Sequence, residues 1–383
     1  MVTGILSDIV VTVPQYRLGV LSHFTVVNQR VSPVNLLLHD ITHSLEFIQK
    51  MIPFFGGNPK DVTIMGHSAG GAFVGELLFS PYIAEKNLFV KVISLSPAMK
   101  FHRLENAINT SQEFAKRAGC YPKNDHYSVY QNEHFMIECL QKVNISTLMS
   151  IQHDLENDNI ELNGVIAAAP FFEGPDYRSI LKMGRSDIPW LVGSTIQEYD
   201  TDRKMELPRR LGFDNPELID HKLSVDRNHS YFGKNINNMS EESLRIVLGT
   251  YEMATVLSDL GAQVYFYQYS YPKNTEHGKF LIYYNGQHFY ELDDNEIELF
   301  KIIPKYYSNF IKTGIPDKDW KLFNTKTTSY MDINYDVSTG LKPKMRNNFE
   351  KETMEYWFND LRSLDQKMTS LKNRIIGKLW SFM

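Results

Sequence analysis

The chain has 383 residues, of which 43% are hydrophobic and 13% aromatic, and its formal net charge is −5. This composition suffices for a large core and for an apolar pocket. The negative net charge and the absence of a basic stripe argue against a nucleic acid partner. No apolar run reaches the ~18 residues that a membrane-spanning helix needs, so we expect no membrane span.

Strand patterns and helix patterns alternate along the chain. Short runs rich in β-branched or aromatic residues predict parallel strands, and the stretches between them predict helices. The predicted strands are 9–13, 62–65, 90–95, 190–193 and 264–271, and the predicted helices are 36–52, 69–78, 104–118 and 241–260. This alternation predicts an α/β fold, in which a mostly parallel sheet carries helices on both faces.

The first predicted strand, 9–13, lies almost at the start of the chain. The residues before it have neither the basic region nor the cleavage site of a secretory signal peptide. A domain that begins in a core strand indicates that part of the fold precedes Met1. We therefore expect the N-terminal strands of the fold to be missing from this sequence.

The pattern G-x-S-x-G occurs at Gly66-His67-Ser68-Ala69-Gly70, between a predicted strand and a predicted helix. In this setting the serine occupies a sharp, strained turn at the C-terminal edge of a sheet, called a nucleophile elbow. Strand and helix nearly touch at such a turn, so small residues must flank the serine, and Gly66 and Gly70 supply them. The pattern predicts that Ser68 is a nucleophile.

A serine nucleophile needs a base, and the base needs an acid that orients it. In folds with this elbow the chain order is serine, then acid, then histidine. Glu198 and Asp200 follow the fourth predicted strand, and His277 and His288 follow the fifth. The residues alone leave two candidates open for each role.

The segments around the elbow are similar to those of a known family. Residues 14–21 resemble the N-Y-R-L-G-V-L-G segment of the type-B carboxylesterases, which include the cholinesterases, and further matches are 35–40 with N-x-G-L-x-D, 55–59 with F-G-G-D-P and 62–71 with V-T-I-F-G-E-S-A-G-G. The resemblance continues at lower identity to about Trp357. It implies an α/β-hydrolase fold and a serine esterase.

The resemblance favours Glu198 as the acid. Residues 191–198 are similar to the family's L-x-G-x-x-x-D-E-G segment, although Gln197 and Tyr199 replace its Asp and Gly. Ser96 matches a family serine that supports the acid, so the resemblance implies a supporting role for Ser96.

The resemblance also favours one base. Residues 288–292 are similar to the family's H-x-x-E-L segment, so His288 falls on the catalytic histidine. The predicted triad is therefore Ser68, Glu198 and His288, and His277 is the alternative base.

Two further features follow from the resemblance. His67 replaces the glutamate that usually precedes the nucleophile, so we expect an altered pH profile or substrate preference. Cys120 and Cys139 resemble the family's paired cysteines, which implies a disulfide. Closing a loop of about 20 residues stabilises a protein by roughly 3 kcal/mol in the chain-entropy model.

The family's H-G-G-G-type loop does not occur in this sequence. In the family its backbone N–H groups supply most of the oxyanion hole, and Ala69 N–H would supply the rest. The strand before that loop lies between strands 9–13 and 62–65 in this fold, so we expect a gap at the centre of the sheet. We expect the chain alone to be nearly inactive as an esterase, because lost oxyanion donors slow turnover. We also expect it to be poorly soluble, because unpaired strand edges favour association.

The predicted function is carboxylic ester hydrolysis of a small-molecule substrate through an acyl-enzyme on Ser68. No cofactor or metal is needed, and no metal-binding motif is present. The alternatives are a non-catalytic binding or adhesion protein of the same fold, an inactive fragment, or a hydrolase of thioesters or amides.

We predict two parts, a domain over residues 1–357 and a helical tail over 358–383. Apolar residues recur at steps of three and four in the tail, which is typical of an amphipathic helix that packs on its own domain or self-associates. They are Met354, Trp357, Leu361, Leu364, Met368, Leu371 and Ile375.

The family resemblance suggests secretion or an endoplasmic reticulum location. Glycosylation acceptor patterns agree with such a compartment, although they are common by chance. They begin at Asn109, Asn144, Asn228 and Asn238.

Overall fold

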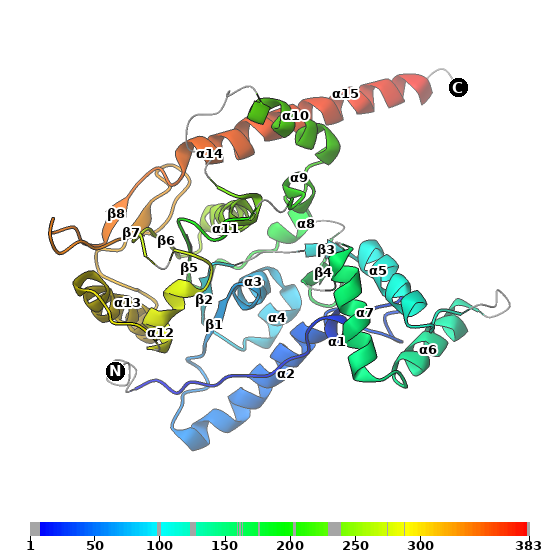
Figure 1. Cartoon of the computed structure of the whole chain (residues 1–383), viewed down its shortest axis with the longest axis horizontal. Helices are drawn as coiled ribbons and strands as arrows, with labels where there is room; N and C mark the ends of the chain where they lie inside the picture. The colour runs from blue at the N-terminus through cyan, green and yellow to red at the C-terminus, as the bar shows by residue number, and fades with distance from the viewer. Residues whose placement is uncertain are drawn as a thin grey trace.

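The computed structural model describes residues 8–97, 101–122, 128–158, 160, 162, 164–174, 177–201, 204–228, 239–273, 275–286 and 288–380. Its centre is a six-stranded sheet with the order β1-β2-β5-β6-β7-β8 (Figure 1). The strands are β1 (Thr63–His67), β2 (Lys91–Leu95), β5 (Trp190–Thr195), β6 (Val264–Tyr269), β7 (Tyr330–Ile333) and β8 (Lys344–Arg346). All neighbours are parallel except β7 and β8, which are antiparallel. The predicted α/β class is confirmed, while β7 and β8 were not predicted.

Both faces of the sheet are buried, as the alternation within β6 shows. Val264 and Phe266 pack into the hydrophobic cluster formed with α2 (Leu36–Met51), α3 (Ala69–Glu76) and α11 (Glu241–Asp259). Tyr265, Tyr267 and Tyr269 pack into a second cluster with α12 (Ile282–Asn285) and α13 (Asp294–Thr313). Successive side chains of a strand point to opposite faces, so a strand covered on both faces is apolar or aromatic throughout.

The other helices differ in length and lie around the sheet and its loops. They are η1 (Ile52–Phe55), η2 (Leu77–Phe79), α4 (Pro81–Lys86), α8 (Tyr177–Leu181), α9 (Leu207–Arg210), α10 (Pro216–Asn228), η4 (Lys279–Leu281), α14 (Lys351–Glu355), the π-helical η5 (Tyr356–Leu361) and α15 (Arg362–Trp380). Within the part of the chain that the structure describes, no helix is both long enough and apolar enough to cross a membrane.

A small lobe with its own core lies beside the sheet (Figure 1). It contains α1 (Val20–His23), α5 (Leu104–Arg117), α6 (Val129–Leu140) and α7 (Ile145–Asn157), next to the two-stranded parallel sheet of β3 (Phe101–Arg103) and β4 (Val165–Ala167). The predicted disulfide is present in this lobe. It joins Cys120 and Cys139, whose Cα atoms are 5.5 Å apart, and so connects the end of α5 to α6.

The prediction of a strand over residues 9–13 is wrong. Residues 9–13 form extended chain outside the sheet, with Val11 67% and Val13 80% exposed. A core strand needs neighbours that bond its N–H and C=O groups, and no described strand pairs with this segment. The predicted gap at the centre of the sheet is wrong for the same reason, because β1 forms the edge of the sheet instead.

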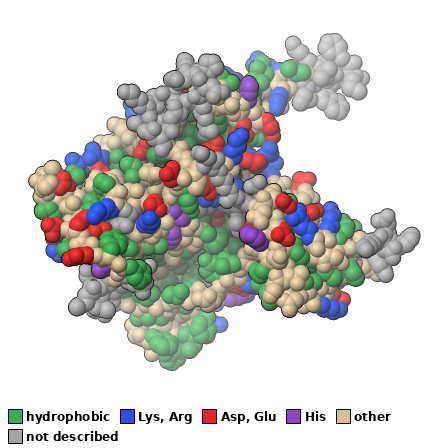
Figure 2. Space-filling model, viewed as in Figure 1, with side chains coloured by type: hydrophobic (Ala, Val, Ile, Leu, Met, Phe, Trp, Pro, Cys, Tyr) green, Lys and Arg blue, Asp and Glu red, His purple; other side chains and the backbone are tan. Residues whose placement is uncertain are grey.

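Apolar side chains are exposed near the end of α2. Phe47, Phe54 and Phe55 are 62%, 81% and 69% exposed, and Met65 on the edge strand β1 is 43% exposed. Figure 2 shows hydrophobic side chains over the projection at the bottom, where Figure 1 places the end of α2. Exposed apolar edges favour association between chains, so poor solubility of the chain stays a prediction.

The C-terminal helix packs on the domain along its first part only. Trp357 and Leu361 are buried, whereas Leu371 and Ile375 are 49% and 60% exposed. In Figure 1 the far end of α15 extends away from the body of the molecule. The division at residue 357 and self-association through the tail both stay predictions.

Asp365 on α15 fixes the start of α10. Its buried carboxylate accepts hydrogen bonds from the backbone N–H groups of Asp214 (2.9 Å) and Asn215 (2.8 Å), and from the Asn215 side chain (2.9 Å). A buried backbone N–H group that loses its acceptor lowers the stability of the fold, because it is neither hydrated nor hydrogen-bonded.

We expect Asp365→Ala to lower the free energy of unfolding by about 2–4 kcal/mol, because it leaves these buried donors without an acceptor. Urea unfolding followed by circular dichroism measures the change. Asp360→Ala, at an exposed carboxylate one turn earlier, is the control. An equal effect of the two substitutions would contradict a specific role of Asp365.

Candidate active site

Ser68 lies at the turn between β1 and α3, where it is the N-cap residue of the helix. Its backbone has φ 55° and ψ −120°, a conformation that costs a non-glycine residue about 1–3 kcal/mol and is found mainly at functional sites. The Ser68 N–H donates to the carbonyl of Leu95 at the end of β2 (2.9 Å), which ties the turn to the neighbouring strand. The strained turn of a nucleophile elbow is thus present at Ser68.

The glycines around the turn have different roles. A Cβ at Gly66 would lie 2.2 Å from the carbonyl oxygen of Gly70, so this position accepts only glycine. Gly70 has no such contact, because a Cβ there would meet only the Tyr16 hydroxyl at 3.9 Å. Gly71 is the second restricted position, since its Cβ would lie 2.9 Å from the Leu95 carbonyl oxygen. The sequence predicted that Gly66 and Gly70 are the small residues where strand and helix nearly touch. This is right for Gly66 and wrong for Gly70, because the close contact on the helix side occurs at Gly71.

Three side chains from the ends of β1, β5 and β6 meet at this turn. The Nε2 atom of His277 lies 2.6 Å from the Ser68 Oγ atom, and its Nδ1 atom lies 2.7 Å from an Oε atom of Glu198. The His277 backbone N–H also donates to the carbonyl oxygen of Glu198 (2.7 Å). These distances join a nucleophile, a base and an acid in one chain of hydrogen bonds.

His288 is not part of this arrangement, and its predicted position beside Ser68 is wrong. It is exposed, its Nδ1–H donates to the carbonyl oxygen of Tyr290 (2.9 Å), and its ring packs near Phe300 on α13. The reason is the chain path: η4 and α12 follow His277 directly and lead away before His288 is reached. His277 lies in the loop just after β6, and the glycine that follows it, Gly278, has φ +80° and begins η4.

Glu198 is buried, with 1% of its surface exposed. One carboxylate oxygen accepts from the Thr195 N–H (2.7 Å) and the other bonds His277. A supporting role of Ser96 does not come from a hydrogen bond to Glu198, because the buried Ser96 Oγ has no hydrogen-bond partner among the described residues. Asp200, the other acid candidate, is exposed. The structure therefore brings Glu198 and not Asp200 to the histidine.

His67 contacts the base directly. The ring centroids of His67 and His277 are 4.7 Å apart, and Phe280 packs on the His67 ring at 6.2 Å. Burial, and secondarily the positive charge that His277 can carry, lower the pKa of His67 to about 4. The imidazole of His67 is therefore neutral at pH 7, where a glutamate would carry a charge.

This low pKa predicts a pH-dependent stability. The unfolded chain takes up a proton on His67 as the pH falls through about 6.5, whereas the folded chain does so only near pH 4. Stability is therefore lost as the pH falls through this window. We expect the wild type to lose more unfolding free energy between pH 7 and pH 5 than His67→Gln, as measured by urea unfolding. Equal losses would contradict the lowered pKa.

The Ala69 N–H lies at the first position of α3, next to Ser68. The first N–H groups of a helix have no partner within the helix and carry its positive dipole end. This donor can serve an oxyanion formed on a carbonyl carbon bonded to Ser68. The predicted position of Ala69 is thus compatible with an oxyanion-hole role.

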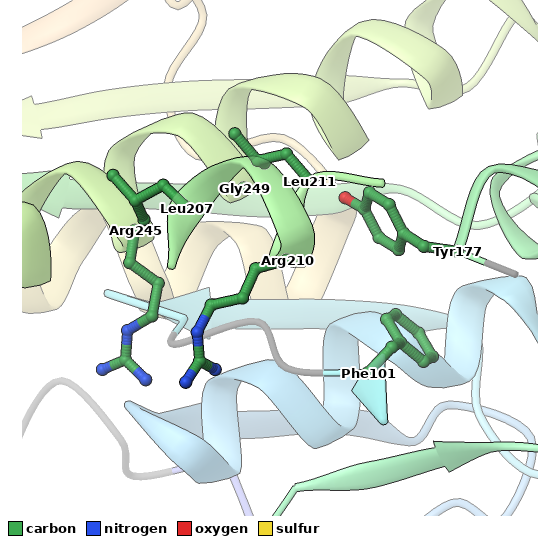
Figure 3. A pocket seen from close by; sticks show the side chains of 7 residues that line it. All are labelled: Phe101, Tyr177, Leu207, Arg210, Leu211, Arg245 and Gly249. Carbon is green, nitrogen blue, oxygen red and sulfur yellow. The ribbon is translucent and has the colours of Figure 1, made fainter. Parts of the chain in front are cut away.

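A pocket opens near the first half of α11 (Figure 3). Phe101 and Tyr177 contribute aromatic rings, and the guanidinium groups of Arg210 and Arg245 point in a similar direction. Leu207, Leu211 and Gly249 complete its lining. The pocket is therefore lined by both apolar and positively charged side chains, and it is not the purely apolar pocket that the aromatic content allows. Across the described ranges, no group of three or more His, Cys, Asp or Glu residues could hold a metal ion.

Comparison with known proteins identifies the family. The model of the carboxylesterase family matches residues 3–224 and 216–357. Carboxylesterase 1C of Rattus norvegicus is 25% identical over 401 residues, covering 92% of this chain and 68% of that protein. Cocaine esterase of Homo sapiens is 24% identical over 413 residues, covering 96% and 70%.

Among solved structures, a thermophilic PNB esterase superposes with a TM-score of 0.69 at 20% sequence identity, covering 89% of this chain and 72% of that one. This likeness shows an α/β-hydrolase fold. The chain belongs to the carboxylesterase family, as its motifs predicted, and it spans about two thirds of the length of these relatives. Membership of this family supports hydrolysis of ester substrates.

Proposed function

We propose that this protein is a carboxylic ester hydrolase that acts through Ser68, His277 and Glu198. The observation that supports it most directly is the hydrogen-bonded chain from Ser68 Oγ through His277 to the buried Glu198 carboxylate. A binding protein of the same fold has no use for a strained serine aligned with a base and an acid.

The proposed reaction has two steps. The Ser68 hydroxyl attacks the ester carbonyl carbon while its proton passes to His277 Nε2, and the carbonyl oxygen becomes an oxyanion. The tetrahedral intermediate collapses, the alcohol leaves with the proton from His277, and Ser68 is acylated. Water, deprotonated by His277, then releases the acid by the same path. Glu198 holds the imidazole and stabilises its charged form.

Labelling with a fluorophosphonate tests the proposal, because it reports a nucleophilic serine even where turnover is slow. We expect the label on Ser68 of the full chain, located by mass spectrometry, and hydrolysis of p-nitrophenyl butyrate that Ser68→Ala abolishes. The exposed Ser370→Ala should behave as the wild type. Labelling that persists at another serine in Ser68→Ala would remove Ser68 from the mechanism.

A further inference from the structure

Tyr199 directly follows the acid Glu198, and the start of α11 holds its backbone. Its N–H donates to the Ser243 Oγ atom (2.8 Å), and its carbonyl oxygen accepts from Ser240 Oγ (2.7 Å) and Ser243 Oγ (3.0 Å). Ser240 is also the N-cap of α11, where its side chain accepts from the Ser243 N–H. The polar groups that begin this 19-residue helix therefore fix the position from which the Tyr199 side chain extends.

The ring of Tyr199 lies against the ring of the proposed base. The centroids of the Tyr199 and His277 rings are 4.6 Å apart, and the interplanar angle is 28°, so the two rings stack face to face. The face of an aromatic ring is the negative side of its quadrupole. The side chain of His277 is only 13% exposed, so little water screens this contact.

The other ring that contacts His277 brings no negative charge to it. His67 lies at a centroid distance of 4.7 Å and is neutral at pH 7, because burial above all lowers its pKa to about 4. The family motifs have a glutamate at the position of His67 and a glycine at the position of Tyr199. At these two positions the chain therefore has one negative charge less and one aromatic ring more, and both side chains contact the same imidazole.

His277 becomes positively charged during the proposed reaction. The Ser68 proton passes to its Nε2 atom while the Nδ1 proton stays with Glu198, so the imidazole gains one unit of charge. A cation over the face of an aromatic ring, within about 6 Å of the centroid, is attracted by the ring. The stacked Tyr199 ring meets this condition. Because the attraction acts on the charged form only, it stabilises the transition state more than the ground state.

We propose that Tyr199 is a positioning residue that acts through His277, and that its ring stabilises the charged imidazole by a cation–π contact. This proposal rests on the proposed function. In both steps His277 first takes a proton, from Ser68 or from water, and then gives it to the leaving alcohol or back to Ser68. The Tyr199 ring takes part in no proton transfer, and it lowers the free energy of the protonated base.

Tyr199→Leu tests the ring, because it keeps an apolar side chain but removes the aromatic face. We expect kcat to fall about 2- to 30-fold with little change in KM, as the loss of one cation–π contact predicts. Tyr199→Phe keeps the face and should stay within about two-fold of the wild type. Tyr121→Leu, at an exposed tyrosine in the lobe, is the control, and thermal unfolding checks that each variant is folded.

Fluorinated phenylalanines at position 199 separate the charge of the ring face from its shape. Each added fluorine weakens the negative face and changes the size of the ring little. We expect kcat to fall in steps from Phe to the variants with one, two and three ring fluorines, incorporated by amber suppression. This series also decides the question if Tyr199→Leu does not fold.

The pH dependence of kcat/KM gives a readout that a loss of packing alone would not move. A ring face that stabilises charged His277 favours its protonation, so Tyr199→Leu should shift the acid limb to lower pH, by about 0.4–1.5 units for the same free energy. The substitution leaves the charged and titratable groups around the two rings in place. They are His67, Glu198, Glu242, Arg245, Glu276 and Lys279.

Three outcomes would overturn the proposal. The first is a kcat of Tyr199→Leu equal to that of the wild type. The second is a loss of kcat that fluorination does not reproduce and that leaves the acid limb in place, because this pattern indicates packing alone. The third is a Tyr199→Phe variant as slow as Tyr199→Leu, which would assign the effect to the hydroxyl. Failure of the proposed function is distinguishable, because labelling and hydrolysis would then persist in Ser68→Ala, whatever residue 199 is.

Discussion

His277→Ala is expected to lower the rate of Ser68 labelling and of ester hydrolysis at least about a thousand-fold, while His288→Ala stays within about two-fold of the wild type. Removal of the catalytic histidine of a serine protease lowers kcat by about 10⁶. Here the His277 Nε2 atom is the group 2.6 Å from Ser68 Oγ, whereas His288 is exposed and bonds the carbonyl of Tyr290.

The comparison of the two histidines is informative because both follow β6. The second-order rate constant for fluorophosphonate labelling measures the nucleophilicity of Ser68, and thermal unfolding of each variant checks that the fold is retained. If His288→Ala were the more damaging substitution, the base would be His288, and the loop after β6 would adopt another path in the active protein.

Glu198→Gln is expected to lower kcat by about 10²–10⁴, less than His277→Ala does. Removal or neutralisation of the orienting acid of a serine protease lowers kcat by about 10⁴. Glutamine keeps the shape of Glu198 and one acceptor oxygen, but it loses the charge that stabilises protonated His277. The loss should lie mainly in kcat, because Glu198 acts through the histidine.

Asp200→Asn provides the matched control. It neutralises an exposed carboxylate that lies two residues after Glu198 in the sequence. Steady-state kinetics with p-nitrophenyl butyrate should show this control within about two-fold of the wild type. A comparable loss in both variants would indicate a general effect of negative charge at this edge of the sheet, and would argue against a specific role for Glu198.

The neutral imidazole of His67 separates this site from one with a glutamate before the nucleophile. A glutamate would place a second negative charge near His277, in addition to Glu198. With His67 neutral at pH 7, the charge that His277 gains during the reaction is balanced by Glu198 alone. We therefore keep the expectation of an altered pH profile as a prediction.

Local sequence patterns determined the α/β class and the elbow. The strand and helix periodicities around Ser68 are local properties, and a strand–turn–helix with Gly66 and Ser68 permits few other structures. The motifs also predicted the family and the pairing of Cys120 with Cys139. The strand pattern alone placed both Glu198 and Asp200 after the same strand. The family resemblance then favoured Glu198 as the acid.

Only the tertiary structure decided between His277 and His288. Both follow the same strand, and the choice depends on where η4 and α12 turn the chain, which no local pattern gives. The same holds for Gly71, whose restriction comes from a carbonyl group of β2, and for residues 9–13, which are apolar but pair with none of the strands that the structure describes. The Tyr199 ring stacks on His277, which lies on another element of the chain, and side-chain contacts of that kind are fixed by packing, not by local propensity.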